Sequence, residues 1–367
     1  MHSMFPSVRH KTALSLLGFM LAGQVGALEC GKFEFPNCDG PDMQYADGFD
    51  PQVGYGGFGG GDCIASKTPV IFIHGNADRA INWDSPVVDG VEHYSPPTRS
   101  VYAEFKQHGY NDCELFGVTY LNAMEQANPQ NNYHRPDKEK ILSDFIAAVM
   151  AYTKKDKVDI VTHSLGVSMT MAALRYSDSW NSVRRFVNIA GGIRGLKSCA
   201  AMGYMNPLTP TCDSENIFNP YFFGLFPDNG ISGGGRNDWT GANTEFSLRR
   251  VPKRHPDVSF YTLLAGKYDE IHCSTLNARD DCAKGALFSP NSNVKAQLNL
   301  GAGSIASASN LIFTGSHPGN PMGGDTDGIG HFKVKNNSGQ ILYTILNSDC
   351  RGIACAGNYA GGPVVED

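Results

Sequence analysis

The feature that most constrains the fold is a junction near the middle of the chain. A short apolar run, residues 158–161 (VDIV), passes through residues 162–166 (THSLG) into a helical stretch that continues to about residue 176. A short apolar run that ends at a turn is typical of a strand buried on both faces. A strand that leads directly into a helix predicts a parallel sheet, because parallel strands are joined by crossovers of this kind.

The rest of the chain repeats this alternation. Residues 138–154 predict an amphipathic helix, with Ile141, Phe145 and Val149 on one face. Strands alternating with helices indicate an α/β fold with a mostly parallel central sheet and helices on both faces. Further strands are expected at residues 70–73, 114–120, 185–189, 258–264 and 294–300, and further helices at residues 100–108 and 340–346.

The serine in this junction has the surroundings of a nucleophile. Ser164 stands between a strand and a helix, with Gly166 two positions later, as in the nucleophile elbow of α/β-hydrolases. Thr162 departs from the G-x-S-x-G pattern, so an ordinary helix-capping serine is the alternative. If Ser164 is the nucleophile, the N-terminus of the following helix stabilises negative charge that develops beside it, and the Leu165 N–H is a candidate oxyanion donor.

In this fold the acid and the base follow the nucleophile in that order. Asp269 lies just beyond the strand predicted at residues 258–264, where α/β sites collect, and Glu270 and Asp281 are its competitors. The sequence Gly-Ile-Gly-His-Phe at residues 328–332 predicts a flexible loop that presents His331 as the base.

Three other histidines are weaker candidates for the base. His317 is a further downstream candidate, and His272 is too near Asp269 in the sequence to reach across. His163 adjoins Ser164 but is expected to point to the opposite side, in a supporting role. The second oxyanion donor should follow an earlier strand, and the N–H of Asn76 in His74-Gly75-Asn76 has that position.

The N-terminus has the pattern of a secretory signal peptide. Basic residues precede an apolar run at residues 13–22, and small residues then predict cleavage after Ala27. That run is short for a bilayer span, which needs about 20 apolar residues. The segment holds two of the 30 Lys and Arg and no acidic residue, so 28 basic against 36 acidic residues remain, a charge of −8. An acidic protein lacks the positive surface that nucleic acid requires.

All ten cysteines lie after the predicted cleavage point, as expected for a disulfide-bonded protein of an oxidising compartment. Four pairs are close in sequence, Cys30/Cys38, Cys199/Cys212, Cys273/Cys282 and Cys350/Cys355, which leaves Cys63/Cys113. Spacing alone does not fix the connectivity. None of these cysteines has the close C-x-x-C spacing of a zinc site, so disulfides are favoured over metal.

Two glycine-containing strings resemble ligand motifs without their context. Residues 54–59 satisfy G-x-G-x-x-G, but no apolar strand precedes them and no helix follows. Residues 28–66 as a whole are rich in Gly, Pro and Asp and predict a loop-rich segment. Residues 325–328 (DTDG) resemble the start of a calcium loop that lacks its later ligands, which indicates a solvated turn.

Five segments carry a resemblance to a known family: KTPVIFIHGN at residues 67–76, RSVYAEFKQHGYNDCELFGVTYL at 99–121, VDIVTHSLGVSM at 158–169, IAGGIRGL at 189–196 and NVKAQLNLGAGS at 293–304. They resemble the secreted bacterial polyhydroxybutyrate (PHB) depolymerases of the lipase-like α/β-hydrolase type. The similarity extends along nearly the whole chain after residue 27. Thr162 and Leu165 stand where that family has Ala and Met, and Ala200-Ala201 and Ile217-Phe218 stand where it has tyrosine pairs.

This resemblance implies a serine esterase that hydrolyses poly(3-hydroxybutyrate) outside the cell. It implies a catalytic triad of Ser164, Asp269 and His331, an oxyanion hole from Asn76 and Leu165, and a substrate-contacting Tyr133. It also implies a single catalytic domain over residues 28–367, without metal or cofactor, and we expect a monomer.

Two further expectations concern the substrate. The alternative function is a secreted lipase or carboxylesterase that acts on monomeric esters or triglycerides. Residues 302–324 form a long irregular stretch, which makes them a candidate lid.

Overall fold

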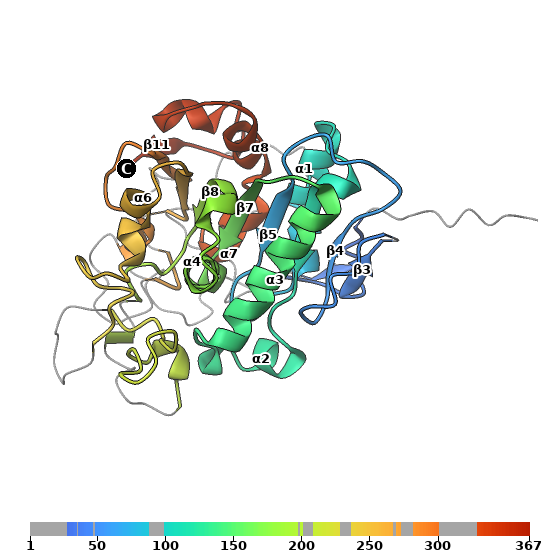
Figure 1. The fold of residues 1–367 in the computed structure, drawn as a ribbon. Coiled ribbons are helices and arrows are strands. Elements are labelled where there is room, and N and C mark those ends of the chain that lie inside the picture. Colours follow the sequence, from blue (N-terminus) through green and yellow to red (C-terminus); the bar gives the residue numbers. More distant parts are fainter. Residues whose placement is uncertain are drawn as a thin grey trace, which may run out of the picture.

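The computed structural model describes residues 28–34, 36–46, 48–87, 99–196, 199–200, 208–227, 236–266, 269–272, 282–300 and 329–367. Its centre is a nine-stranded sheet in the order β11-β10-β9-β8-β7-β5-β6-β4-β3 (Figure 1). The strands from β10 to β6 run parallel to their neighbours, whereas β11 and β4 pair antiparallel with β10 and β6. The strands are β3 (Met43–Tyr45), β4 (Gly57–Gly59), β5 (Val70–Ile73), β6 (Leu115–Val118), β7 (Val158–His163), β8 (Val183–Ile189), β9 (Ser259–Leu264), β10 (Val294–Leu300) and β11 (Val364–Glu366), and a separate hairpin joins β1 (Phe33–Glu34) to β2 (Asn37–Cys38).

Helices cover both faces of this sheet, as β5 illustrates. Val70 and Phe72 belong to a hydrophobic cluster that includes residues of α1 (Val101–Gln107) and α8 (Gly339–Asn347). The alternate residues Ile71 and Ile73 belong to the opposite cluster, which includes residues of α3 (Pro136–Thr153) and α4 (Leu165–Tyr176). Because successive side chains of a strand point to opposite faces, every β5 residue is buried.

The predicted α/β fold is therefore confirmed, including its mostly parallel sheet. Each strand and helix expected from the sequence corresponds to an observed element, with ends displaced by a few residues. The shorter elements α2 (Ala123–Ala127), α6 (Val251–Arg254) and α7 (His331–Asn336) were not expected. In the described part of the chain, no helix has the length and apolar character that a bilayer crossing requires.

Residues 28–66 are loop-rich as predicted, but they also contain short strands that were not expected, of which β3 and β4 complete one edge of the sheet. The string at residues 54–59 contributes β4 rather than a ligand loop. A Cβ on Gly57 would lie 2.1 Å from the Gly117 carbonyl oxygen, and a Cβ on Gly59 would lie 2.3 Å from the Phe116 ring. These glycines thus allow β4 to approach β6 closely.

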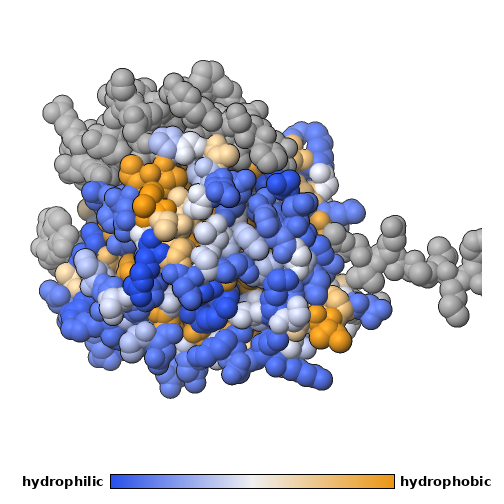
Figure 2. Space-filling view, turned by 90° about the horizontal axis from the view of Figure 1, so that it is seen from above, coloured by the Kyte–Doolittle hydropathy of each residue, from blue (hydrophilic) through white to orange (hydrophobic). Residues whose placement is uncertain are grey.

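Four of the five expected disulfides join described residues: Cys30–Cys38, Cys63–Cys113, Cys199–Cys212 and Cys350–Cys355. The expected partner of Cys282, Cys273, lies outside the described residues, as do the predicted signal peptide, the candidate lid and the DTDG string. The face that is uppermost in Figure 1 is mostly hydrophilic, with small separate apolar patches (Figure 2).

Candidate active site

Ser164 lies at the sharp turn between β7 and α4. Its φ of 54° and ψ of −127° are unfavourable for a residue with a side chain, and its N–H donates to the Ile189 carbonyl at 2.9 Å. A Cβ on Gly166 would lie 2.2 Å from the His74 carbonyl oxygen, and a Cβ on Gly75 would lie 2.8 Å from the Ser164 Cβ. The turn therefore has the geometry of a nucleophile elbow, and it requires glycine at positions 75 and 166.

Thr162, the departure from the usual elbow pattern, is accommodated inside the sheet. The residue is fully buried, and its Oγ1 donates to the Val187 carbonyl at 2.8 Å. The hydroxyl thus has an acceptor on the neighbouring strand β8, so that it adds no unsatisfied polar group.

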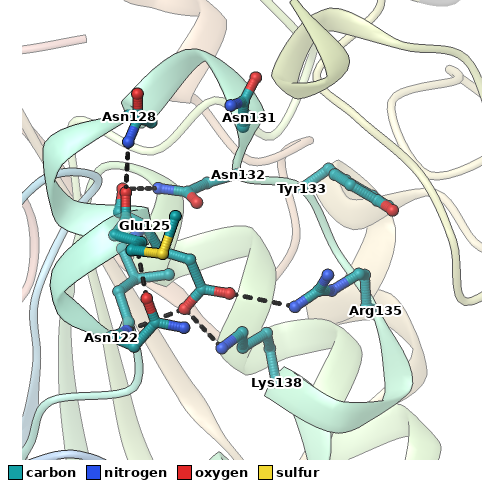
Figure 3. A pocket seen from close by; sticks show the side chains of 10 residues that line it. Asn122, Glu125, Asn128, Asn131, Asn132, Tyr133, Arg135 and Lys138 are labelled. Atoms are coloured by element: carbon teal, nitrogen blue, oxygen red, sulfur yellow. Dashed lines mark hydrogen bonds and ion pairs between the residues drawn. The ribbon is translucent and has the colours of Figure 1, made fainter.

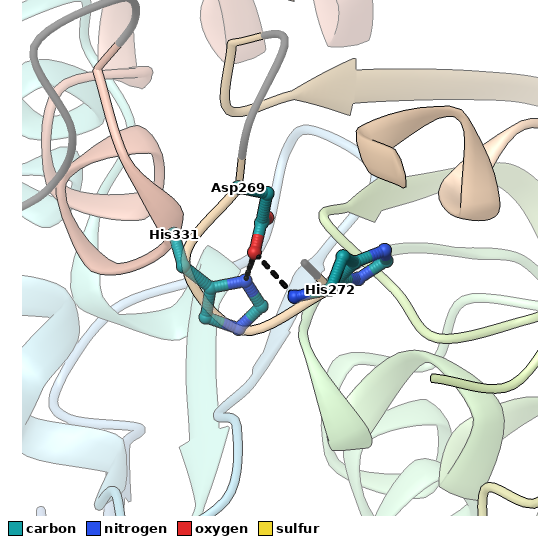
Figure 4. Close-up of side chains that lie close together, drawn as sticks. All are labelled: Asp269, His272 and His331. Atoms are coloured by element: carbon teal, nitrogen blue, oxygen red, sulfur yellow. Dashed lines mark hydrogen bonds and ion pairs between the residues drawn. The ribbon is translucent and has the colours of Figure 1, made fainter. Parts of the chain in front are cut away.

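The structure brings Ser164, His331 and Asp269 together although they are far apart in the sequence. His331 Nε2 lies 2.8 Å from Ser164 Oγ, and His331 Nδ1 lies 2.8 Å from Asp269 Oδ2 and 3.0 Å from Oδ1. His331 and Asp269 are each 1% exposed, whereas Ser164 is half-buried, so the hydroxyl is the accessible end of the line. Figure 4 shows the imidazole directed at the carboxylate.

The loop after β9 fixes the carboxylate. Asp269 Oδ1 accepts hydrogen bonds from the N–H groups of Ile271 and His272, each at 2.9 Å. The ring of His272 is engaged elsewhere, since its Nε2 lies 3.0 Å from the Ala190 carbonyl oxygen. The structure thus places His272 next to the acid. Asp281, a competitor for the acid, and His317, a competitor for the base, lie outside the described residues.

The setting of His331 differs from the flexible loop that the sequence suggested. His331 is the first residue of α7, and Gly330 before it has a φ of 84°. The Gly330 N–H donates to the Ala265 carbonyl at 2.9 Å, which ties the start of α7 to the end of β9. A glycine is needed there because a residue with a Cβ rarely adopts this conformation.

Two neighbouring carboxyl groups raise the pKa of the His331 imidazole. Burial lowers the pKa of His331, but the charge of Asp269, its hydrogen bond and the charge of Glu270 raise it, and the net shift is upward. Burial raises the pKa of Asp269, but His331 and His272 outweigh it and hold that pKa well below its usual range. Asp269 is therefore ionised at neutral pH, and it can orient the imidazole and stabilise its cation.

One candidate oxyanion donor, Leu165, adjoins the nucleophile, and the other, Asn76, follows Gly75, where a Cβ would lie 2.8 Å from the Ser164 Cβ. Leu165 is the first residue of α4, so its N–H has no partner in the preceding turn of the helix. Asn76 follows β5, and two hydrogen bonds fix its side chain. Its Nδ2 donates to the Pro129 carbonyl at 2.9 Å, and its Oδ1 accepts from Asn132 Nδ2 at 2.7 Å.

The strand order changes direction at β5, because β6 lies on one side of it and β7, which comes later in the chain, lies on the other. Such a switch point forms a crevice at the carboxyl ends of the strands.

A cavity of about 250 Å³ is lined by Asn132, Tyr133 and neighbouring side chains (Figure 3). Glu125 accepts from Lys138 at 2.6 Å and from Arg135 at 3.1 Å, and Asn132 lines the same cavity. The charged groups of this cavity are thus paired with one another. Tyr133 lines it as well, and the adjacent Asn132 bonds to Asn76.

Tyr133 also lines a second pocket of about 660 Å³. Its ring lies 6.3 Å from that of Phe222, and the pocket lining includes Ile217 and Phe218, which are 87% and 90% exposed. The predicted substrate-binding residue thus lines both pockets.

Sequence reasoning missed the ion pair that joins α7 to the loop after β5. Lys335 Nζ lies 2.7 Å from Asp78 Oδ2, and both side chains are largely buried. The lysine holds the pKa of Asp78 at about 2 against the opposing effect of burial. Lys335 is one helical turn after His331, but no local pattern in the sequence pairs it with Asp78.

One group of side chains has the composition of a metal site. Potential ligand atoms of Asp269, His272 and His331 lie within 4.8 Å of one another. Because Asp269 and His331 are already hydrogen-bonded to each other, a metal here would have to disrupt that bond.

Comparisons with known proteins find similarity to lipases and esterases. Residues 67–223, somewhat less than half of the chain, match the model of the class 2 lipase family. No curated protein matches the chain. Lipase B of Aspergillus fumigatus is 17% identical (TM-score 0.44), covering 82% of this chain and 59% of its own. The lipase BlEst2 of Bacillus licheniformis in its propeptide form is 14% identical (TM-score 0.43), covering 81% and 54%.

The chain thus spans little more than half the length of these two lipases. The carboxylesterase CesB of Bacillus subtilis is 10% identical (TM-score 0.30), with 65% of this chain and 79% of that one covered. The order of the sheet, the elbow between β7 and α4 and the class 2 lipase match identify the chain as having a lipase-like α/β-hydrolase fold.

Proposed function

We propose that this protein is a secreted serine esterase that hydrolyses the ester bonds of poly(3-hydroxybutyrate) to short products. The observation that carries the catalytic part is the continuous hydrogen-bonded line from Ser164 through His331 to Asp269. A hydroxyl, an imidazole and a buried carboxylate in this arrangement are the components of nucleophilic acyl transfer.

The mechanism follows from the atoms of that line. Ser164 Oγ attacks the ester carbonyl while His331 Nε2 takes its proton, and Asp269 stabilises the resulting imidazolium. The N–H groups of Asn76 and Leu165 stabilise the tetrahedral oxyanion. The imidazolium then protonates the departing alcohol, which leaves an acyl-enzyme. Water then attacks the acyl carbon while His331 Nε2 takes its proton. The bond from the acyl carbon to Ser164 Oγ breaks, His331 returns the proton to Oγ, and the acid product leaves. These steps require no metal or cofactor.

The choice of polymer is supported by the resemblance of five sequence segments to PHB depolymerases. The exposed Ile217 and Phe218 offer apolar contact to a polyester surface, although they are not the tyrosines of that family. Secretion is supported by the N-terminal pattern and by the disulfides. Protein recovered from the culture medium should begin at Leu28, which N-terminal sequencing would check. A single catalytic domain over residues 28–367, acting as a monomer, is part of the same proposal.

The second candidate is a secreted lipase or carboxylesterase that acts on monomeric esters or triglycerides. The match of residues 67–223 to class 2 lipases favours it. The two candidates share the same mechanism and differ in substrate.

The test is clearing of an amorphous PHB suspension by the protein and by Ser164→Ala, with tributyrin and p-nitrophenyl butyrate run in parallel. Loss of the nucleophile should reduce turnover of every substrate by about 10⁴-fold or more. Clearing that disappears in Ser164→Ala supports the depolymerase. Hydrolysis of the soluble esters without clearing supports the second candidate, and unchanged activity of Ser164→Ala would refute both.

A further inference from the structure

The main chain of His331 is held on both sides by buried side chains. Its N–H donates to Glu270 Oε2 at 2.8 Å, and its carbonyl oxygen lies 2.8 Å from His163 Nε2. Glu270 is 6% exposed and His163 is 2% exposed, so water competes little for either bond.

These two residues occupy related positions in the sequence. Glu270 directly follows Asp269, and His163 directly precedes Ser164. The neighbour of the acid and the neighbour of the nucleophile therefore each bind the peptide backbone of the base. Through them the loop after β9 and the end of β7 are both bonded to the first residue of α7.

The protonation of His163 suits this bond. A carbonyl oxygen can only accept, so His163 Nε2 must carry the proton. Burial, followed by the charge of His331, holds the pKa of His163 well below its usual range, so the ring stays neutral. Its Nδ1 has no hydrogen-bond partner in the part of the chain that the structure describes. Within the described residues, the His163 ring thus uses its one proton to bind the His331 carbonyl oxygen.

The start of α7 also depends on Glu270. Gly330, the residue before the helix, has no side chain that could cap it, and the first N–H groups of a helix lack partners within it. Glu270 supplies an acceptor to the first of them. Burial and the neighbouring Asp269 raise the pKa of Glu270 to about 7. Either protonation state leaves an oxygen that can accept from the His331 N–H.

We propose that His163 and Glu270 are positioning residues that clamp the backbone of His331, so that its imidazole stays in line between Ser164 and Asp269. This inference rests on the proposed serine-esterase mechanism and adds two residues to it. An imidazole that is free to shift by about 1 Å is expected to lose on the order of 100-fold in rate.

The test compares variants that keep a hydrogen bond with variants that remove it. Glu270→Gln keeps an acceptor and His163→Gln keeps a donor, whereas Glu270→Met and His163→Leu keep neither. With p-nitrophenyl butyrate, we expect kcat to fall about 100-fold in the Met and Leu variants, with KM changed less than about threefold, and less than about tenfold in the Gln variants. Combining the Met and Leu changes should cost less than the product of the single losses, because both act on the same peptide.

Two controls distinguish loss of the clamp from misfolding and from a change of charge. Thermal unfolding identifies variants that fail to fold. If Glu270→Met fails to fold, the comparison of Glu270→Gln with Glu270→Asp takes its place. Aspartate keeps the charge but withdraws the oxygen, so the clamp requires Glu270→Gln to be more active than Glu270→Asp. The reverse order would overturn the proposal, as would full activity of the Met and Leu variants. Ser164→Ala in the same assay tests the esterase mechanism itself, so a failure of the clamp alone remains distinguishable.

Discussion

At the scale of single residues, the site depends on groups that lie near one another only after folding. The sequence identified Ser164 from its strand-to-helix junction, and chain order pointed to Asp269 and His331 among several competitors. The structure places these three in one hydrogen-bonded line. Glu270 was considered only as a rival acid, and its contact with the His331 N–H could not be predicted, because it depends on how the loop after β9 meets α7.

The raised pKa of His331 gives a pH prediction. His331 must be neutral to accept the serine proton, and its pKa lies above 6.5. We therefore expect kcat/KM for p-nitrophenyl butyrate to rise with pH, with an apparent midpoint above 6.5. Because Glu270 titrates nearby, the midpoint describes the coupled group rather than one residue.

The Glu270→Gln variant tests the cause of that shift. The charge of Glu270 helps to raise the pKa of His331, so its removal should move the midpoint to lower pH. A pH–rate profile between pH 5 and about 9 would measure both values. A midpoint below 6.5 in the unmodified protein, or an upward shift in the variant, would contradict this account.

At the scale of secondary structure, strands with continuous apolar runs were predicted well, and the two- and three-residue strands were missed. β5 and β7 are buried along their whole length, which produces the runs that identified them. β4 is the tripeptide Gly-Phe-Gly, and β3 and β11 also have three residues each. Their pairing depends on neighbouring strands far away in the sequence, so no local pattern reveals them.

Helix α3 contains an unpaired buried carboxyl. Glu139 is fully buried, and neither of its oxygens has a hydrogen-bond partner in the described structure. Burial, with a smaller effect of Asp137, raises its pKa from 4.5 to about 8. Between these values the unfolded chain has released the proton and the folded chain retains it. Stability should therefore fall as pH rises from about 4.5 to about 8.

Glu139→Met should relieve this cost. We expect the variant to be more stable by about 1–2 kcal/mol at pH 8, with a smaller difference near pH 4.5. Thermal unfolding at the two pH values would measure the effect. Asp144→Asn, on the half-exposed side of the same helix, is the control and should change stability by less than about 0.5 kcal/mol. A gain that is the same at both pH values would show that the charge of Glu139 is not its cause.

At the scale of the whole molecule, the disulfides close loops of very different length. Cys63–Cys113 spans 50 residues and links the segment before β5 to the turn before β6, whereas Cys350–Cys355 spans five. Both pairs were expected from the sequence, the first by elimination. Its long separation could not be inferred from spacing, because it is set by how β5 and β6 lie side by side.

The two disulfides should differ in their effect on stability. Closing a longer loop restricts the unfolded chain more. Replacing Cys63 and Cys113 by Ser should cost about 4 kcal/mol, and replacing Cys350 and Cys355 about 2 kcal/mol. Denaturant unfolding of the two double variants would measure both. An equal or larger loss from the short loop would show that native contacts, rather than loop length, determine the difference.

The three-residue strands at the two edges of the sheet also affect how copies of the protein meet. An edge strand can template pairing with another chain, and a short edge offers few free main-chain groups for this. β3 and β11 hold these edge positions, and β11 carries Glu366 among its exposed residues. A secreted protein can reach a high local density wherever it gathers at a surface. At such density, the short edge strands β3 and β11 would make it harder for copies to aggregate by pairing their sheets edge to edge.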